Sequence, residues 1–236
     1  MRHQPTGSLH VAVALGACAG FVDAHVYLHV TPVFVANMSG NLVHLGMYLG
    51  QRGWSGALAS AVALCGFAVA VVLATVHHDM LLRAGRHVRS DRLIAIEAAL
   101  VLTLSLLISK LHVQFTTRPI PRDLPVLLVG GLAMGLQAAS LRRVGEISVS
   151  TTYATGSVVR VGEKVALGLR RADRATEARR RVTIIVLLVV MASYVLGAVA
   201  AAAAGADPML LVLPAGLLAG AALLVYRWPT DLPGDM

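Results

Sequence analysis

Long apolar runs that alternate with short polar segments constrain this chain more than any other feature of its sequence. The longest runs each reach about the 20 residues that an α-helix needs to cross the hydrocarbon core of a membrane. Hydrophobic residues make up 57% of the sequence and charged residues 14%, against roughly 45–50% and about 25% in soluble domains. The sequence therefore predicts an all-α polytopic membrane protein.

The positive charge of the chain lies between the apolar runs. The formal net charge is +8, and many of the arginines gather in two blocks, one between Arg83 and Arg92 and one between Arg170 and Arg181. Such blocks are typical of cytoplasmic loops, where they contact anionic lipid headgroups. A nucleic-acid-binding protein would need a contiguous basic face and aromatic side chains on which bases stack. We therefore expect the bilayer and its anionic headgroups as partners, and no nucleic acid.

The apolar runs predict six membrane spans and two shorter, broken segments. Pro32 disfavours helical geometry at Thr31, so the first span should end there. Pro119 and Pro121 place the linker at residues 110–123 in a loop. We expect the spans at residues 9–30, 55–82, 93–109, 124–141, 182–204 and 209–226, and the broken segments at residues 33–50 and 147–169.

The order of these parts recurs in the second half of the chain. Gly16-xxx-Gly20 is matched by Gly131-xxx-Gly135, at an offset of 131 − 16 = 115 residues. The sequence VANMSGNLVHLG, which begins at residue 35, is matched by TTYATGSVVRVG, with an offset of 156 − 40 = 116 at the central glycine. We therefore predict two related halves of three spans each, residues 1–109 and residues 124–236, joined by the loop at residues 110–123.

The two arginine blocks favour one topology over its alternatives. If both broken segments crossed the membrane, there would be eight spans, and the two blocks would lie on opposite sides. If both segments re-enter, there are six spans, and both blocks lie on the same side as the two termini, in the cytoplasm. Three spans per half would make the halves inverted repeats, as in many secondary transporters with discontinuous helices. Seven spans, with one segment crossing, remains the alternative.

Short motifs in both halves are similar to those of a known family. GFVDA at residues 20–24 and FVANMSGNLV at residues 34–43 resemble the signature of the YoaK-like bacterial inner-membrane proteins, a family of unknown function. The sequences GLQ at residues 135–137 and TTYATG at residues 151–156 resemble its second signature. Ser39 stands where the family has Thr, and Ala138 where it has Asn. The resemblance implies a multi-pass inner-membrane protein of about six or seven spans, without an established substrate.

Asp23 is the main candidate for a functional residue. On an α-helix, Gly16, Gly20, Asp23 and Tyr27 fall on one face, and the glycine spacing allows another helix to approach this face closely. A carboxylate within a span costs at least about 2.5–3.5 kcal/mol on insertion scales and usually marks a functional site. Asp23 is therefore a candidate proton carrier. The alternative is a structural hydrogen bond to neighbouring backbone or to Asn41.

The two broken segments supply the remaining candidates for binding a solute or an ion. Their amide, hydroxyl and backbone groups would lie at membrane depth, where a helix end leaves backbone groups free for a ligand. The alternative is that the same side chains form polar contacts between helices. The candidates are Tyr27, Asn37, Ser39, Gly40 and Asn41 in the first half, and Gln137, Thr151, Thr152, Thr155, Gly156 and Ser157 in the second.

The remaining chemistry-bearing residues predict no metal site, cofactor or enzyme. His25 and His29 are spaced one helical turn apart, but Asp23 lies about 200° around the helix from His25, so they cannot form one chelate. The sequence contains neither an HExxH motif nor a glycine-rich phosphate loop. We therefore expect neither a bound metal nor catalysis.

Three further residues within spans have simpler expected roles. Glu97 follows the start of its span by about one turn, so we expect it to pair with Arg92 or with the N-terminal end of its helix. Cys18 and Cys65 lie within apolar runs, where we expect buried thiols and no disulfide.

Together these features predict a secondary transporter for a small polar solute, in which a proton-coupled mechanism would use Asp23. The alternative is a membrane sensor, scaffold or assembly partner that moves no solute. The pairs Gly46/Gly50 and Gly216/Gly220 have the spacing of helix-packing faces, either within the chain or between the subunits of a homo-oligomer.

Overall fold

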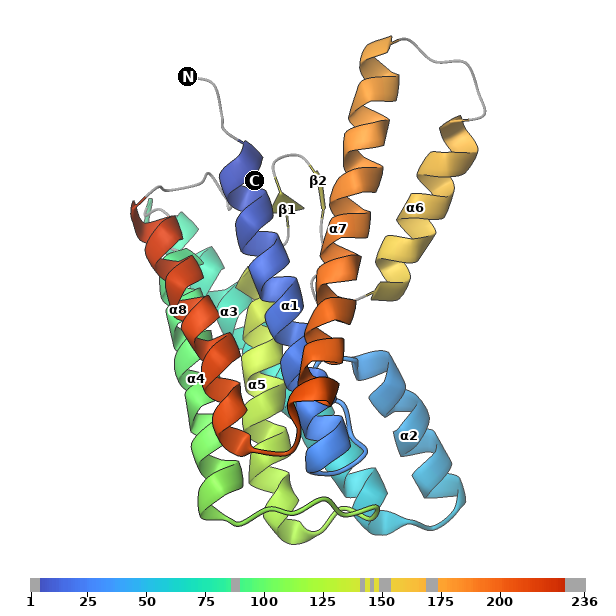
Figure 1. The fold of residues 1–236 in the computed structure, drawn as a ribbon, viewed down its shortest axis with the longest axis vertical. Coiled ribbons are helices and arrows are strands. Elements are labelled where there is room, and N and C mark those ends of the chain that lie inside the picture. The colour runs from blue at the N-terminus through green and yellow to red at the C-terminus, as the bar shows by residue number, and fades with distance from the viewer. Residues whose placement is uncertain are drawn as a thin grey trace.

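A computed structural model describes residues 5–85, 90–140, 143–144, 147–148, 154–168 and 174–227 of the chain. The described part is almost entirely helical (Figure 1). Its helices are α1 (Pro5–His29), α2 (Met38–Gly50), α3 (Trp54–Arg83), α4 (Ser90–Lys110), α5 (Leu124–Ser140), α6 (Ala154–Gly168), α7 (Arg174–Ala204) and α8 (Val212–Arg227). Two 3-10 turns, η1 (Pro121–Asp123) and η2 (Pro208–Leu211), precede α5 and α8, and the two-residue strands β1 (Arg143–Val144) and β2 (Ile147–Ser148) pair antiparallel.

Six of the described helices are long and apolar enough to span a membrane, which confirms the predicted number of spans. They are α1, α3, α4, α5 with η1, α7 and α8 with η2. Helix α2 has 13 residues and α6 has 15, so at 1.5 Å per residue they extend only about 20–23 Å, less than a hydrocarbon core of about 30 Å. The six-span interpretation therefore holds over the seven-span alternative.

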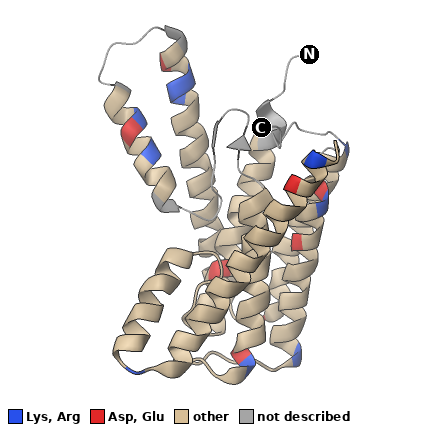
Figure 2. Ribbon diagram, turned by 180° about the vertical axis from the view of Figure 1, so that it is seen from behind, with Lys and Arg blue, Asp and Glu red and all other residues tan. Residues whose placement is uncertain are grey.

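The short helices occupy different ends of the molecule. In Figure 1, α2 lies beside the lower half of the bundle and α6 beside the upper half. The start of α1, the end of α3, the start of α4, the end of α6, the start of α7 and the end of α8 all lie toward the upper end. Figure 2 shows lysines and arginines at the α3–α4 end and along α6 and α7. This arrangement is the one that six spans with two re-entrant segments predict, and the side that faces the cytoplasm stays a prediction.

Two helix boundaries differ most from the predicted ones. Helix α7 begins at Arg174 rather than at residue 182, because the intervening residues are mostly strong helix formers and Glu177 forms an i,i+4 salt bridge of 2.5 Å with Arg181. Helix α6 begins at Ala154 rather than at residue 147, since Ile147 belongs to the short β1–β2 pair. Both differences shift helix ends without changing the number of spans.

Glycines let two pairs of helices approach closely. Helix α1 packs along α7, and a Cβ atom added to Gly20 would overlap the carbonyl oxygen of Tyr194. Helix α3 packs along α5, and a Cβ atom added to Gly135 would overlap the carbonyl oxygen of Phe67. In each half, the first helix thus packs against the third helix of the other half: α1 against α7, and α5 against α3. Two halves related by a two-fold axis would pack in this way. The repeat itself stays a prediction.

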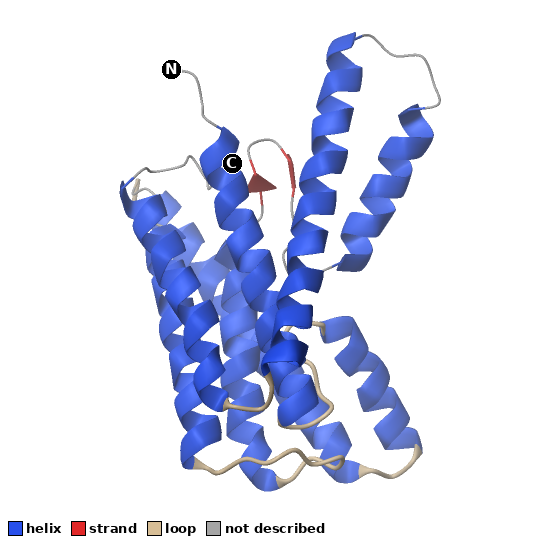
Figure 3. Ribbon diagram, in the orientation of Figure 1, coloured by secondary structure: helices blue, strands red, loops and turns tan. Residues whose placement is uncertain are grey.

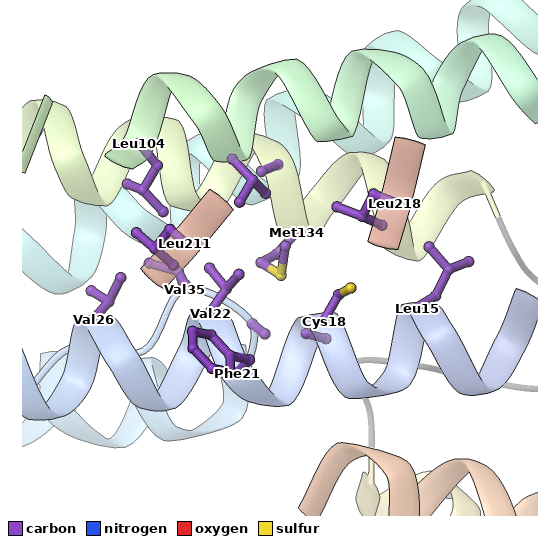
Figure 4. Packing of buried hydrophobic residues seen from close by; sticks show 14 of the residues in the cluster. Leu15, Cys18, Phe21, Val22, Val26, Val35, Leu104, Met134, Leu211 and Leu218 are labelled. Carbon is purple, nitrogen blue, oxygen red and sulfur yellow. The ribbon is translucent and has the colours of Figure 1, made fainter. Parts of the chain in front are cut away.

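The core lies where α1, α4, α5 and α8 meet. Figure 4 shows Leu15 and Cys18 of α1 facing Met134 of α5 and Leu218 of α8, with Leu104 of α4 farther along the bundle. The glycines at positions 46, 50, 216 and 220 lie outside such contacts, because among the described residues nothing beyond each glycine's own stretch of helix lies within 4 Å of an added Cβ. They therefore face outward and do not pack helices within the chain.

Candidate functional site

Asp23 joins α1 to two parts of the chain that are distant in sequence. Its Oδ1 atom accepts hydrogen bonds from the backbone N–H groups of Val35, at 2.6 Å, and Ala36, at 2.7 Å. Its Oδ2 atom accepts a hydrogen bond of 2.6 Å from the hydroxyl of Tyr194 on α7. The side chain is buried, with 2% of its surface exposed. All three contacts of this carboxylate are therefore with hydrogen-bond donors.

The two backbone partners of Asp23 lie in residues 30–37, a non-helical stretch between α1 and α2 that we call the break (Figure 3). Helix α1 ends at His29, just before the predicted end at Thr31, because Pro32 cannot continue it. Backbone groups of such a stretch lack the partners that a helix would provide, and within a membrane water cannot replace them. The carboxylate of Asp23 supplies an acceptor for two of these N–H groups.

Two asparagines complete the support of the break. The side chain of Asn41 is buried and bonds both backbone groups of Phe34, accepting from its N–H at 3.0 Å and donating to its C=O at 2.6 Å. Asn37 is the N-cap of α2 and accepts a hydrogen bond of 3.3 Å from the N–H of Gly40. Ser39 is exposed and donates to the side chain of Asn37. Four of the predicted site residues therefore shape the start of α2.

Aromatic rings hold the break against α1 and α2. The ring of Tyr27 stacks on Phe34, with centroids 4.4 Å apart, and Phe34 stacks in turn on His44, at 5.9 Å. His44 meets the ring of Tyr48 edge to face. A Cβ atom added to Gly40 would lie 2.9 Å from the Phe34 ring. Tyr27 and Gly40 thus belong to the same assembly as Asp23 and Asn41.

Among the described residues, the second half places its predicted site residues differently. Gln137 of α5 is buried and donates from Nε2 to the carbonyl oxygen of Leu15, at 2.8 Å. On α6, Gly156 is exposed and Ser157 is buried. Thr151, Thr152 and the side chain of Thr155 lie outside the described residues. The structure therefore gathers the candidates of the first half into one site, and the hydrogen bond of Gln137 to Leu15 does not involve that site.

Comparison with known proteins shows to which family this chain belongs. Residues 11–225 match a family described as "Protein of unknown function (DUF1275)". The chain belongs to this family. It is also similar to the UPF0700 transmembrane protein YoaK of Bacillus subtilis (strain 168), with 30% identity over 148 residues, which are 63% of each chain. No solved structure gives a significant match.

These matches confirm the YoaK-like resemblance of the sequence motifs. With the six spanning helices, they make this DUF1275 protein an integral, multi-pass membrane protein of an uncharacterised family. The aligned part spans less than two thirds of the length of YoaK. The bacterial inner membrane and the cytoplasmic termini stay predictions.

The sequence missed Tyr194, which no prediction connected with Asp23. The two residues lie 171 positions apart. Ser193 and Gly197 flank Tyr194 with the spacing of a helix-packing motif, and a Cβ atom added to Gly197 would overlap the carbonyl oxygen of Ala17 on α1. This small-residue pair was the one available signal that α7 approaches α1 here. Asn41, the predicted alternative partner of Asp23, bonds Phe34 instead.

The expected pairing of Glu97 is wrong. Arg92 is exposed, whereas Glu97 is fully buried and neither carboxyl oxygen has a hydrogen-bond partner. The reason is helical periodicity: Glu97 is one turn from Leu93 and one turn from Val101, and both of these residues are buried. Glu97 thus lies in the core stripe of α4 rather than at its solvent-facing end.

Among the cysteines and histidines, one expectation is wrong, the burial of Cys65. Cys18 is buried and donates to the carbonyl oxygen of Pro214, while Cys65 is exposed rather than buried, and both are free thiols. His25 is buried between Phe21 and His29, and neither of its ring nitrogens has a hydrogen-bond partner. Within the described residues, no group of three metal-ligating side chains comes together.

Proposed function

We propose that this DUF1275 protein is a secondary transporter for a small polar solute. One observation carries the proposal: the break places irregular backbone beside half-length α2, where Asp23, Asn37 and Asn41 hold it in place. Irregular backbone at membrane depth is tolerated only where protein or a water-filled cavity covers it. In secondary transporters, such breaks form the substrate site near the middle of the membrane.

The contact between α1 and α7 is one at which the two helices could move relative to each other. At Gly20 and Gly197 the backbones of the two helices come into direct contact. The hydroxyl of Tyr194 crosses this contact and bonds Asp23, which in turn holds the break. A shift of α7 relative to α1 would therefore alter the hydrogen bond between Tyr194 and Asp23, and through Asp23 the geometry of the break. Alternating access in transporters uses such movements of one group of helices against another.

The side chains at the start of α2 indicate the class of solute. Asn37 is half-buried and Ser39 is exposed, so an amide and a hydroxyl group are within reach of a ligand. Neither carries a charge. We therefore propose a small polar solute bound through hydrogen bonds rather than through a strong ion pair.

The direct test is solute flux in proteoliposomes of the purified protein. A panel of amino acids, sugars, nucleosides and small organic acids would be offered with and without an imposed pH gradient, with protein-free liposomes as the control. Uptake of at least one solute class above the control is the expected result. If the protein is monodisperse and inserted in the liposomes and yet no solute of the panel is taken up, the proposal is contradicted. That result would favour the sensor or scaffold alternative.

A further inference from the structure

The core of the bundle holds a second acid, which the break does not use. Glu97 of α4 has no exposed surface, and both of its carboxyl oxygens lack a hydrogen-bond partner. It lies within electrostatic range of the Cys18 thiol on α1. It lies seven positions after Ser90, the first residue of α4, which is about 10 Å along the helix axis. The carboxyl group is therefore well inside the span.

No described helix packed against α4 supplies a counter-charge along its length. Helix α5 contains no charged residue, and α8 contains only Arg227, at its last position. The η2 turn carries no ionisable side chain. Cys18 is the titratable group that α1 brings near. An ionised Glu97 would thus be a buried charge without a donor or a cation, which costs several kcal/mol even after the protein relaxes.

The neutral acid suits these surroundings better. A protonated carboxyl group has one O–H to donate and can leave its other oxygen in an apolar contact at smaller cost. Buried acceptors without donors are what a site that binds a proton presents. The surroundings of Glu97 therefore match a bound proton.

Asp23 has the opposite surroundings. Its carboxylate receives three hydrogen bonds, two from backbone N–H groups and one from Tyr194, so the ionised form is the one that its partners match. Two acids whose environments favour opposite protonation states have separable roles. Asp23 holds the break, and Glu97 is free to gain and lose a proton.

We propose, building on the transport function above, that Glu97 is the residue that carries the coupling proton. In the conformation described here it holds the proton. When the helices around it separate toward the arginine-rich end, the O–H bond breaks, the proton passes to a water molecule, and the carboxylate that remains is solvated. The proton-carrying role predicted for Asp23 thereby moves to α4.

Infrared spectroscopy of the full chain in lipid nanodiscs tests the proton site without any solute. The chain has only four glutamates, so ¹³C-glutamate labelling shifts a small set of carboxyl bands. Spectra would be recorded between about pH 5 and about pH 9. In the wild type, we expect a band of a protonated carboxyl group that is still present at neutral pH and that shifts on labelling. This band should be absent in Glu97→Gln. The matched control, Asp23→Asn, should retain it. If the wild-type protein has no such band at neutral pH, the proposal is overturned. This measurement uses the wild type alone, so it does not depend on whether a variant folds.

Proteoliposomes separate this proposal from the transport function. With any solute that the wild type accumulates, Glu97→Gln should lose the dependence of uptake on a pH gradient and retain downhill exchange. Unchanged gradient dependence in Glu97→Gln would overturn the proton role and leave transport intact. A glutamate band that titrates in a protein that moves no solute would contradict transport and still support the proton site.

Discussion

At the scale of residues, Tyr194 and Asn41 show that the same apolar helices use polar side chains for different purposes. Tyr194 links two helices through Asp23, whereas Asn41 satisfies the backbone of a single residue, Phe34. Their predicted energetic contributions follow from the number of buried groups that each would leave unpaired.

Removing the hydroxyl group of Tyr194 should weaken the fold measurably. Tyr194→Phe keeps the ring and leaves Asp23 Oδ2 without its donor, a loss of roughly 1–3 kcal/mol. Thermal unfolding in detergent should show a lower midpoint. Tyr27→Phe is the matched control, since the ring of Tyr27 stacks on Phe34 and the substitution keeps that ring. An unchanged midpoint for Tyr194→Phe would mean that the bond contributes no stability.

Asn41→Leu should destabilise the break more than any change at Ser39. The substitution leaves the buried N–H and C=O groups of Phe34 unpaired, at roughly 1–3 kcal/mol for each group. Ser39→Ala removes only an exposed hydroxyl group and is the control. Thermal unfolding in detergent should show a lower midpoint for Asn41→Leu alone. Equal midpoints for both variants would contradict the role of Asn41.

At the scale of elements, the α1–α7 and α3–α5 pairs position everything else. Each pair depends on glycines that allow backbone-to-backbone contact. The break lies between α1 and α2, and Asp23 connects it to α7, so the separation of α1 from α7 sets the geometry of the site.

Gly20→Leu should prevent the close contact of α1 with α7. A side chain at this position meets the carbonyl group of Tyr194, which is fixed helix backbone and cannot move aside. We expect loss of monodisperse protein in size-exclusion chromatography, because overpacking of a tight contact is strongly destabilising. The control is Gly216→Leu, where no atom lies within 4 Å of the added Cβ. Comparable yields of both variants would rule out a tight α1–α7 contact.

At the scale of the whole molecule, the six spans and two short helices make a topological prediction. The α2–α3 turn lies at the end of the bundle opposite the end of α3 and the start of α4, which carry arginines (Figure 1). If the arginine-rich end faces the cytoplasm, as the positive-inside rule predicts, the two turns differ in access from outside the cell.

Cysteine labelling distinguishes the two sides. In a Cys65→Ser background, Gln51→Cys should react with a membrane-impermeant maleimide in intact cells, because Gln51 is exposed and lies at the α2–α3 turn. Arg83→Cys, at the end of α3, should react only after the membrane is permeabilised. Labelling of Arg83→Cys in intact cells, with Gln51→Cys reacting only after permeabilisation, would contradict this topology.

The sequence by itself determined the number of the spans, the end of the first span before Pro32 and the family. These properties depend on local quantities: the length of apolar runs, the effect of Pro32 on the preceding residue, and short motifs. The polar groups around the break were also predicted from the sequence, because Asp23, Asn37 and Asn41 stand out within apolar segments.

Only the tertiary structure decided which groups these polar side chains meet. Tyr194 reaches Asp23 across 171 positions because α7 packs along α1, and Glu97 is buried because its face of α4 meets the core rather than Arg92. Cys65 faces outward for the same reason, since the packed face of α3 lies elsewhere. Helix periodicity gives a residue's angle around its own axis, whereas the partner at that angle depends on how the whole bundle packs.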